Sequence, residues 1–365
     1  MVRRWGVLLA IASILGVGLA LFPTLIKRDP TRGVFDLAVA NNGAVWAVSD
    51  HGIAHFDGQE WAIVTDIGFA GITVAPDGIV WAYTDAQVSR FDGTTWQSLT
   101  PNLDLHRRKI CNLKVSTDNI LWVLFCGYDD DSGLIKFDGH VWTFAPPIPE
   151  KFVRGIKGYH LLGLDQRGRP WVTNWAGTFY LDEDQWVGTS DWINEVAFGT
   201  DGSRWATEWG SVFFHPDPPA SPISIMQSIT VASLCYQSPG GNQECYPLAP
   251  TLDNDPNTNP AIKRGAKALT STVLITPEIT SLTIAPDNTL WLATTNYIDT
   301  DTSNSTPIPK YVSTLIHFDG RTWQTCQLRP NFPYIRKLKV APDNSIWVIT
   351  ASSVERLSAS VIHCN

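Results

Sequence analysis

The sequence predicts an all-β fold, a seven-bladed β-propeller of four-stranded antiparallel blades preceded by one N-terminal transmembrane helix. Three observations predict it. A turn followed by Trp recurs seven times, a Phe-Asp-Gly turn followed by a second Trp recurs between the copies, and one long uncharged segment precedes them all. Propeller blades repeat at about 40–50 residues, and each must stack on its neighbours to bury both of its faces.

The first repeated signature is a short turn, Asp-Gly or Asp-Asn in most copies, with Trp three residues after it. In residues 77–81 the Asp-Gly pair supplies a tight turn between two apolar segments. Successive Trp of this kind are 35, 41, 49, 34, 86 and 56 residues apart. The separation of 86 residues indicates either one blade with an insertion or two blades, of which one is eroded. The seven residues are Trp46, Trp81, Trp122, Trp171, Trp205, Trp291 and Trp347.

The second signature follows the first at a regular offset. In residues 72–99 the two turns, with a short link between them at 84–86, separate four short segments, 72–75, 79–83, 87–91 and 95–99, which predicts four antiparallel strands per blade. Large rigid aromatic side chains at equivalent places indicate wedges packed between stacked blades. The Trp residues of the second signature are Trp61, Trp96, Trp142, Trp323 and, in a degenerate copy, Trp186.

The N-terminal segment has the character of an export signal. Residues 5–26 carry no charge and are flanked by basic pairs at 3–4 and 27–28, and these 22 residues can span a bilayer as a helix. We expect residues 1–28 to be a signal anchor, with a cleaved signal peptide as the alternative. The chain is therefore expected in the bacterial cell membrane as a single-pass protein with its propeller on the extracytoplasmic side, or secreted if the segment is removed.

The propeller itself is predicted over residues 34–365. Residues at about 216–277 break the repeat, since they contain several Pro and the turn-forming run 253–260. We expect this stretch to be an irregular insertion that leaves the ring, with an eighth blade as the alternative.

The pattern Asp-Gly-x-x-Trp-x-x-Thr followed by Phe-Asp-Gly-x-x-Trp resembles the two-component regulator propeller repeat. The resemblance covers roughly residues 34–213 and 279–363. It implies a bacterial periplasmic sensor-type β-propeller. Because the chain ends at Asn365, directly after the last repeat, a stand-alone membrane-anchored form is expected.

Composition excludes one class of partner. The net charge is −8, the sequence pI is about 5.4, and no long Lys/Arg run occurs, so we expect no nucleic-acid binding. The eight His are scattered, and no catalytic, cofactor or metal-binding motif is present. We therefore expect a non-enzymatic ligand-binding or sensing module without cofactor or metal. Its ligand would be a glycan or another small molecule, with a protein partner also conceivable. The alternatives are a protein-interaction scaffold and a metal-dependent lyase of the seven-bladed antibiotic-lyase type.

Six Cys in an exported chain predict three disulfides. If the turn at 118–119 pairs Val115 with Trp122, then Cys111 lies opposite Cys126, within bonding distance. Cys235 and Cys245 bracket a turn-rich loop, and Cys326 and Cys364 remain, in the outer strands of the last two blades.

Trp residues outside both signatures predict the binding face. Trp175 and Trp209 lie on links between the second and third strands of two neighbouring blades, and Trp192 lies on the link that joins those blades. Such links open at one end of a propeller, together with the basic residues Arg107, Arg108, Arg336 and Lys337. Aromatic rings beside polar groups at a concave mouth are typical of ligand sites, and we take these seven residues as the candidate rim site.

Overall fold

The first turn of each blade is set by local chemistry. In blade two, Asp77 Oδ1 accepts the backbone N–H of Ile79 at 3.0 Å, and Gly78 adopts a left-handed conformation with φ of 87°. Gly and Asn tolerate this conformation best, so the sequence specifies the turn locally. In three other blades the left-handed position is held by Asn119, Asn288 and Asn344.

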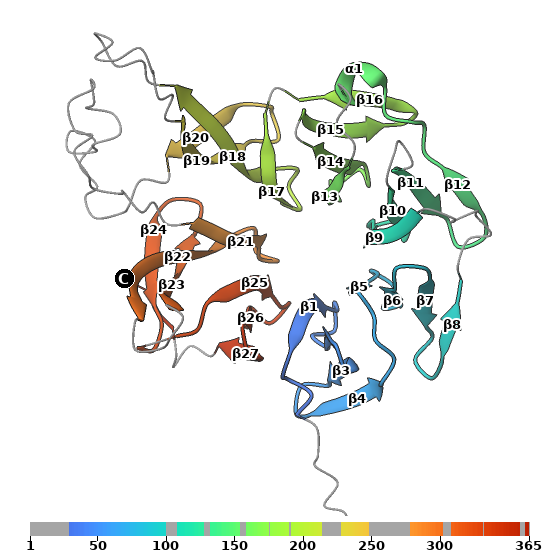
Figure 1. Ribbon diagram of the computed structural model, residues 1–365, viewed down its shortest axis with the longest axis horizontal. Helices are drawn as coiled ribbons and strands as arrows, with labels where there is room; N and C mark the ends of the chain where they lie inside the picture. Colours follow the sequence, from blue (N-terminus) through green and yellow to red (C-terminus); the bar gives the residue numbers. More distant parts are fainter. Residues whose placement is uncertain are drawn as a thin grey trace, which may run out of the picture.

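The computed structural model describes residues 29–99, 108–127, 132–153, 158–174, 176–189, 191–213, 228–247, 278–301, 308–330, 332–357 and 362–364. These residues form seven antiparallel sheets arranged as blades around a common axis, with the first strand of each blade innermost (Figure 1). One helix occurs among them, α1 (Glu150–Val153), and it is a single turn long. The predicted all-β propeller with seven antiparallel blades is confirmed.

Five blades contain four strands each. Blade one consists of β1 (Val34–Val39), β2 (Val45–Ser49), β3 (Gly52–Phe56) and β4 (Trp61–Thr65). Blade two consists of β5 (Gly71–Val74), β6 (Val80–Tyr83), β7 (Val88–Phe91) and β8 (Trp96–Ser98). Blade three consists of β9 (Arg108–Val115), β10 (Leu121–Gly127), β11 (Gly133–Phe137) and β12 (Trp142–Phe144). Blade four consists of β13 (His160–Leu164), β14 (Pro170–Asn174), β15 (Gly177–Asp182) and β16 (Gln185–Gly188).

Blade five contains residues from the stretch that we expected to be irregular. It consists of β17 (Ile193–Phe198), β18 (Arg204–Phe213), β19 (Ser228–Gln237) and β20 (Gln243–Pro247). Residues 228–247 thus supply the third and fourth strands of this blade and are not part of an insertion. Residues 214–227 and 248–277 lie outside the described residues.

The last two blades differ in their number of strands: blade six has five and blade seven has three among the described residues. Blade six consists of β21 (Glu278–Ile284), β22 (Leu290–Asp301), β23 (Ile308–Phe318), β24 (Trp323–Gln327) and β28 (His363–Cys364). Blade seven consists of β25 (Ile335–Val340), β26 (Ile346–Thr350) and β27 (Val354–Leu357). The chain therefore returns from blade seven to add a fifth strand to blade six. At the free edge of blade seven, Val354 donates its backbone N–H to Thr31 at 3.0 Å, which ties the N-terminal residues to the last blade.

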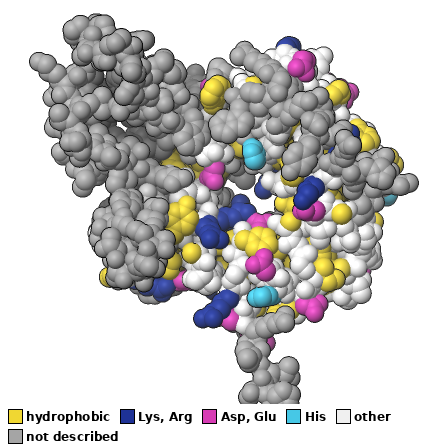
Figure 2. Space-filling view, in the orientation of Figure 1, with side chains coloured by type: hydrophobic (Ala, Val, Ile, Leu, Met, Phe, Trp, Pro, Cys, Tyr) yellow, Lys and Arg dark blue, Asp and Glu magenta, His cyan; other side chains and the backbone are white. Residues whose placement is uncertain are grey.

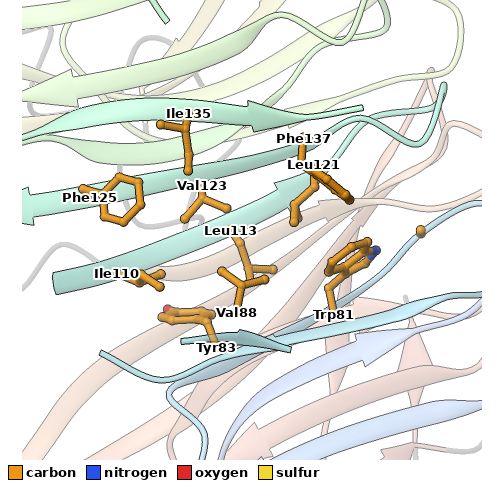
Figure 3. Packing of buried hydrophobic residues seen from close by; sticks show 11 residues of the cluster. Trp81, Tyr83, Val88, Ile110, Leu113, Leu121, Val123, Phe125, Ile135 and Phe137 are labelled. Atoms are coloured by element: carbon orange, nitrogen blue, oxygen red, sulfur yellow. The ribbon is translucent and has the colours of Figure 1, made fainter. Parts of the chain in front are cut away.

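Apolar side chains are buried between blades. Seven clusters of buried residues lie one at each junction, and each contains the first-signature Trp of the preceding blade or packs against it. Figure 3 shows the cluster between blades two and three, where Trp81 and Tyr83 face Ile110 and Leu113. Six of these Trp are 3–7% exposed, and Trp291 is partly buried. The wedge role predicted for the repeated Trp is confirmed.

Three disulfides cross-link the described residues, pairing the six Cys as expected. The strand register predicted for the first pair is wrong by one residue. Val115 pairs with Leu121, and Cys111 is the extra residue of a β-bulge, which still brings its Cα to 5.8 Å from that of Cys126. Cys326 and Cys364 are neighbours within blade six, not members of two blades.

The predicted N-terminal transmembrane helix, residues 1–28, lies outside the described residues. Within the part of the chain that the structure describes, no helix is long and apolar enough to cross a membrane.

Candidate functional site

The predicted rim site is only partly within the described residues. Trp175 and Arg107 lie outside them, and Trp209 is placed as a backbone position in β18. Trp192 is 51% exposed, directly before β17. Arg108 begins β9, and Arg336 is the exposed bulge residue of β25. Arg108, Trp192 and Arg336 thus lie at or near the start of an inner strand, whereas Trp209 lies in the second strand of blade five. Lys337 belongs to a different arrangement on the axis.

The inner strands carry an unexpected set of charged side chains. On each inner strand, one residue pairs with the first-signature Trp of the same blade. These seven residues form a first layer around the axis, and most of them have small side chains. The seven paired residues are Ala38, Thr73, Lys114, Gly163, Ala197, Thr283 and Lys339. Two lysines, in blades three and seven, therefore stand alone in a ring of small residues.

A second layer of charged side chains lies on the inner strands, two residues before the residues that pair with the Trp. Asp36, Glu195 and Lys337 occupy equivalent positions in blades one, five and seven, each opposite the residue two places after the Trp. Side chains two apart point to the same face of a strand, so the two layers share one side of each blade. Five ionisable groups from four inner strands thus converge around the axis.

Side chains of the inner strands also join neighbouring blades. Asp36 Oδ2 accepts the backbone N–H of Ile72 at 2.9 Å, and Glu195 Oε2 accepts that of Leu282 at 3.0 Å. Ser281, at the same position in blade six, accepts from Leu338 at 3.2 Å. The two carboxylates are therefore fixed by the next blade around the ring, as parts of the wall.

One residue of this layer must be glycine for steric reasons. Gly71 holds the second-layer position of blade two, and a Cβ there would lie 2.5 Å from the ring of Tyr83 and 3.0 Å from Asp36 Oδ2. The close approach of Tyr83 lets its hydroxyl donate to the carbonyl of Cys111 at 2.7 Å, which links blades two and three. Burial, with Asp36 and Asp85 nearby, raises the pKa of Tyr83 to about 12, so it remains a donor.

Asp36 and Lys337 form an ion pair across the junction of the last and first blades. Burial raises the pKa of Asp36, but the Lys337 ammonium and the N–H of Ile72 outweigh it, so the pKa lies below its ordinary value. This carboxylate stays ionised, and Lys337 has its counter-charge.

The other two axial lysines have no such partner among the residues that the structure describes. Neither Lys114 nor Lys339 forms a hydrogen bond or ion pair with another residue that the structure describes. Burial lowers the pKa of Lys114 to about 8, and Lys337 adds to this effect while Asp36 opposes it. Burial and the ammonium groups of Lys337 and Lys114 lower the pKa of Lys339 to about 7. The carboxylates of Asp36 and Glu195 act in the opposite direction and limit the decrease.

Glu195 is held closer to its neutral form. Burial raises its pKa to about 7, and the N–H of Leu282 together with Lys339 and Lys337 limits the rise. Near neutral pH the described part of the axis therefore carries the Asp36–Lys337 ion pair, the partly protonated carboxyl group of Glu195, and two lysines that form no ion pair with a described residue.

The axis is open to solvent. Lys114 and Lys339 are surrounded by protein, yet each side chain keeps some accessible surface. Figure 2 shows the molecule hollowed at the centre of the ring, with Lys and Arg side chains gathered beside the hollow over β25 and β1. The inner strands β9 and β25, which carry Lys114 and Lys339, surround the axis (Figure 1).

A second concavity lies away from the axis. It has a volume of about 410 Å³, opens between blades three and four, and is lined by Arg108, Phe125, Tyr159 and Trp186 among others. Trp186 already donates its indole N–H to the carbonyl of Pro146 at 2.8 Å, and Arg108 also has a partner. The polar side chains Trp186 and Arg108 of this concavity already have partners within the protein, whereas Lys114 and Lys339 on the axis form no hydrogen bond or ion pair with a described residue.

The sequence contains a signal for the axial groups that the repeat alignment passes over. Each lies in an apolar strand four or six residues before the Asp or Asn of a first-signature turn, as in the run 335–340 with its alternating Lys. A charge at such a place is unusual because the neighbours are core positions. Among the described residues, no three His, Cys, Asp or Glu side chains come together in a group that could hold a metal ion.

Comparisons with known proteins show the fold. No protein-family model matches the sequence, and no curated protein matches it. The extracellular domain of BT4673 from B. thetaiotaomicron, a proposed one component or hybrid two component system, is similar with TM-scores of 0.51 and 0.52 and 12% and 11% identity. The match covers 89% of this chain, which spans 38% of the length of that domain.

Two further solved structures share the architecture. YCF48 from Cyanidioschyzon merolae has a TM-score of 0.54 and 14% identity over 90% of this chain and 96% of its own. A catalytically inactive virginiamycin B lyase from Staphylococcus aureus, solved with quinupristin, has a TM-score of 0.50 and 11% identity over 89% and 94%.

Proposed function

We propose that the chain is a non-enzymatic, extracytoplasmic ligand-binding or sensing module whose ligand occupies the axis of the ring. One observation carries the proposal: five ionisable side chains from four inner strands converge around the axis of the ring, and two of them form no ion pair or hydrogen bond with another residue that the structure describes. A buried charge without a partner costs stability, and groups held at such a cost are typical of functional sites.

Four observations support the cellular and functional setting. Three disulfides are typical of oxidising compartments, and the sequence begins with an uncharged export-type segment. The repeat resembles that of two-component regulator propellers, and the extracellular domain of BT4673 shares the fold. We propose binding in place of catalysis because both axial carboxylates are engaged as acceptors for the backbone of the next blade.

A ligand screen with a blocked axis tests the proposal. The full-length protein is screened by thermal shift against saccharides, carboxylates, phosphates and amines, together with Thr73→Tyr, which fills an axial position without changing charge. We expect at least one compound to stabilise the parent protein and to lose its effect in the variant. The matched control is Gln97→Tyr, on the exposed outer strand β8. If every compound that binds the parent stabilises Thr73→Tyr equally, the ligand site lies elsewhere.

A further inference from the structure

We propose that the axis binds a small oxyanion, such as a carboxylate or phosphate group, between the ammonium groups of Lys114 and Lys339. The inference rests on the proposed function and adds the chemical class of the ligand and the groups that hold it. Nothing in the repeat requires lysine at these two positions, since Ala, Thr or Gly suffices in the other five blades.

The charge balance at the axis favours an anion. Three lysines and two carboxyl groups surround the axis, and Lys337 is paired with Asp36. Glu195 accepts the backbone N–H of Leu282 and lies near Lys339 without forming an ion pair with it. The protein as a whole has a net charge of −8, so a local excess of ammonium groups is a specific feature of the axis.

The geometry of the ring also favours an anion. Lys114 lies on β9 of blade three and Lys339 on β25 of blade seven, which are three blades apart by the shorter way around the ring of seven. The two side chains therefore approach the axis from nearly opposite sides, and each lies in the electrostatic field of other axial lysines. An anion on the axis would lie between them and relieve their mutual repulsion.

Space and access at the axis favour a small anion as well. The other members of the Lys114 and Lys339 layer are Ala, Thr and Gly, so no bulky side chain occupies the axis at this level. The exposed Arg336 lies one residue before Lys337 at the start of β25. Cationic side chains at and beside the axis favour the approach of an anion over that of a cation.

The ligand chemistry follows from these groups. Ammonium donors and carboxylate or phosphate acceptors form short charge-assisted hydrogen bonds, which are stronger than bonds between neutral groups. Two lysines that approach from opposite sides suit a compact anion with oxygens on more than one side. A neutral sugar would leave both ammonium charges uncompensated.

Isothermal titration calorimetry of the full-length protein with inorganic phosphate, citrate, glucose and choline at pH 6.5 and constant ionic strength tests the inference. We expect phosphate or citrate to bind, and we expect glucose and choline not to bind. Lys114→Met and Lys339→Met keep the length of the side chain and remove its charge. Each should weaken anion binding at least about tenfold, the loss expected for one hydrogen bond to a charged group.

Lys136→Met is the matched control. Lys136 is an exposed lysine on β11 of the same blade as Lys114 and lies away from the axis, so its variant should bind as the parent does. Equal anion affinity in the parent and in both axial variants would overturn the inference, as would the absence of anion binding by the parent. A neutral ligand that is lost in Thr73→Tyr and kept in Lys114→Met would overturn the inference and leave the proposed function standing.

Discussion

Asp36 joins three consecutive blades through one carboxylate. Its Oδ1 accepts a hydrogen bond from the ammonium group of Lys337 in blade seven, and its Oδ2 accepts the backbone N–H of Ile72 in blade two at 2.9 Å. Blade seven has three strands among the described residues, with an isolated bridge between Arg32 and Ser353 at its outer edge. Polar contacts at the inner strands therefore add to the apolar cluster that closes the ring between blades seven and one.

Substitution of Asp36 should consequently destabilise the whole ring. We expect Asp36→Ala to lower the free energy of unfolding by about 2–4 kcal/mol, because it leaves the Lys337 ammonium without its partner and the Ile72 N–H without an acceptor. Urea denaturation at pH 7 measures the loss. Adding Lys337→Met to Asp36→Ala should recover part of it, since the unpaired charge is then removed. If the double variant is less stable than Asp36→Ala, Lys337 has another role.

The stabilisation by Asp36 should be lost in acid. Its pKa in the folded protein lies below the ordinary value of 3.8, so the contribution is complete above about pH 4 and declines as the pH falls through the folded pKa. Asp36→Ala should therefore differ less from the parent protein at pH 3 than at pH 7. An equal difference in stability at both pH values would contradict this account of the pair.

Glu195 should show the opposite dependence on pH. Its pKa rises to about 7 from 4.5, so the folded state favours the protonated form, and the resulting stability is complete below pH 4.5 and is lost as the pH rises through 7. Glu195→Gln keeps an oxygen for the Leu282 N–H and cannot ionise. The variant should therefore gain stability relative to the parent between pH 5 and pH 8, by roughly 1–2 kcal/mol. Thermal unfolding at both pH values would show it, and a difference that does not change with pH would contradict it.

Lys114→Met should stabilise the protein in the absence of ligand. The pKa of Lys114 is lowered to about 8 from 10.5, so its charged form is disfavoured in the folded state and its cost is complete below pH 8. The cost shrinks as the pH rises towards 10.5, where the unfolded chain also loses the proton. We expect a gain of about 1 kcal/mol at pH 7 that declines by pH 10. Lower stability of the variant at pH 7 would show that the lysine supports the fold.

The two kinds of Trp should respond differently to truncation. Trp81 is 5% exposed and wedged between blades two and three, so Trp81→Ala should cost about 3–5 kcal/mol. Trp192 is 51% exposed, and Trp192→Ala should change the stability by less than about 0.5 kcal/mol. Chemical denaturation of both variants makes the comparison. A large loss in Trp192→Ala would show that this rim residue has a structural role.

The fold could be predicted because its determinants are local and repeated. The turn at Asp77 and Gly78 and the wedge at Trp81 recur in nearly every blade, so each copy supports the others. The bulge at Cys111 was not predicted, because no turn residue marks it in the sequence. The inner strands of blades one, five, six and seven are irregular at the equivalent position, so the bulge is a feature of the repeat. The strands at 228–247 were missed because blade five lacks the Phe-Asp-Gly signature.

The axial site could be predicted only in part. Lys337 was recognised as a basic residue but was assigned to the rim, since a repeat alignment does not show that it meets Asp36, 301 positions earlier in the chain. Lys114 and Lys339 acquire significance only when blades three and seven face each other across the ring. Contacts of this kind form only when the propeller closes. The sequence of a single blade does not show which residues of other blades it will face across the ring.

A crystal structure of the full-length protein with selenate tests the central claim most directly. Selenate is an oxyanion with an anomalous scattering signal, and it resembles sulfate and phosphate in shape. We expect an anomalous peak on the axis within hydrogen-bonding distance of the Nζ atoms of Lys114 and Lys339, and its absence in Lys114→Met crystals grown in the same way. Selenate bound elsewhere on the protein, with the axis empty in the parent crystals, would contradict the account.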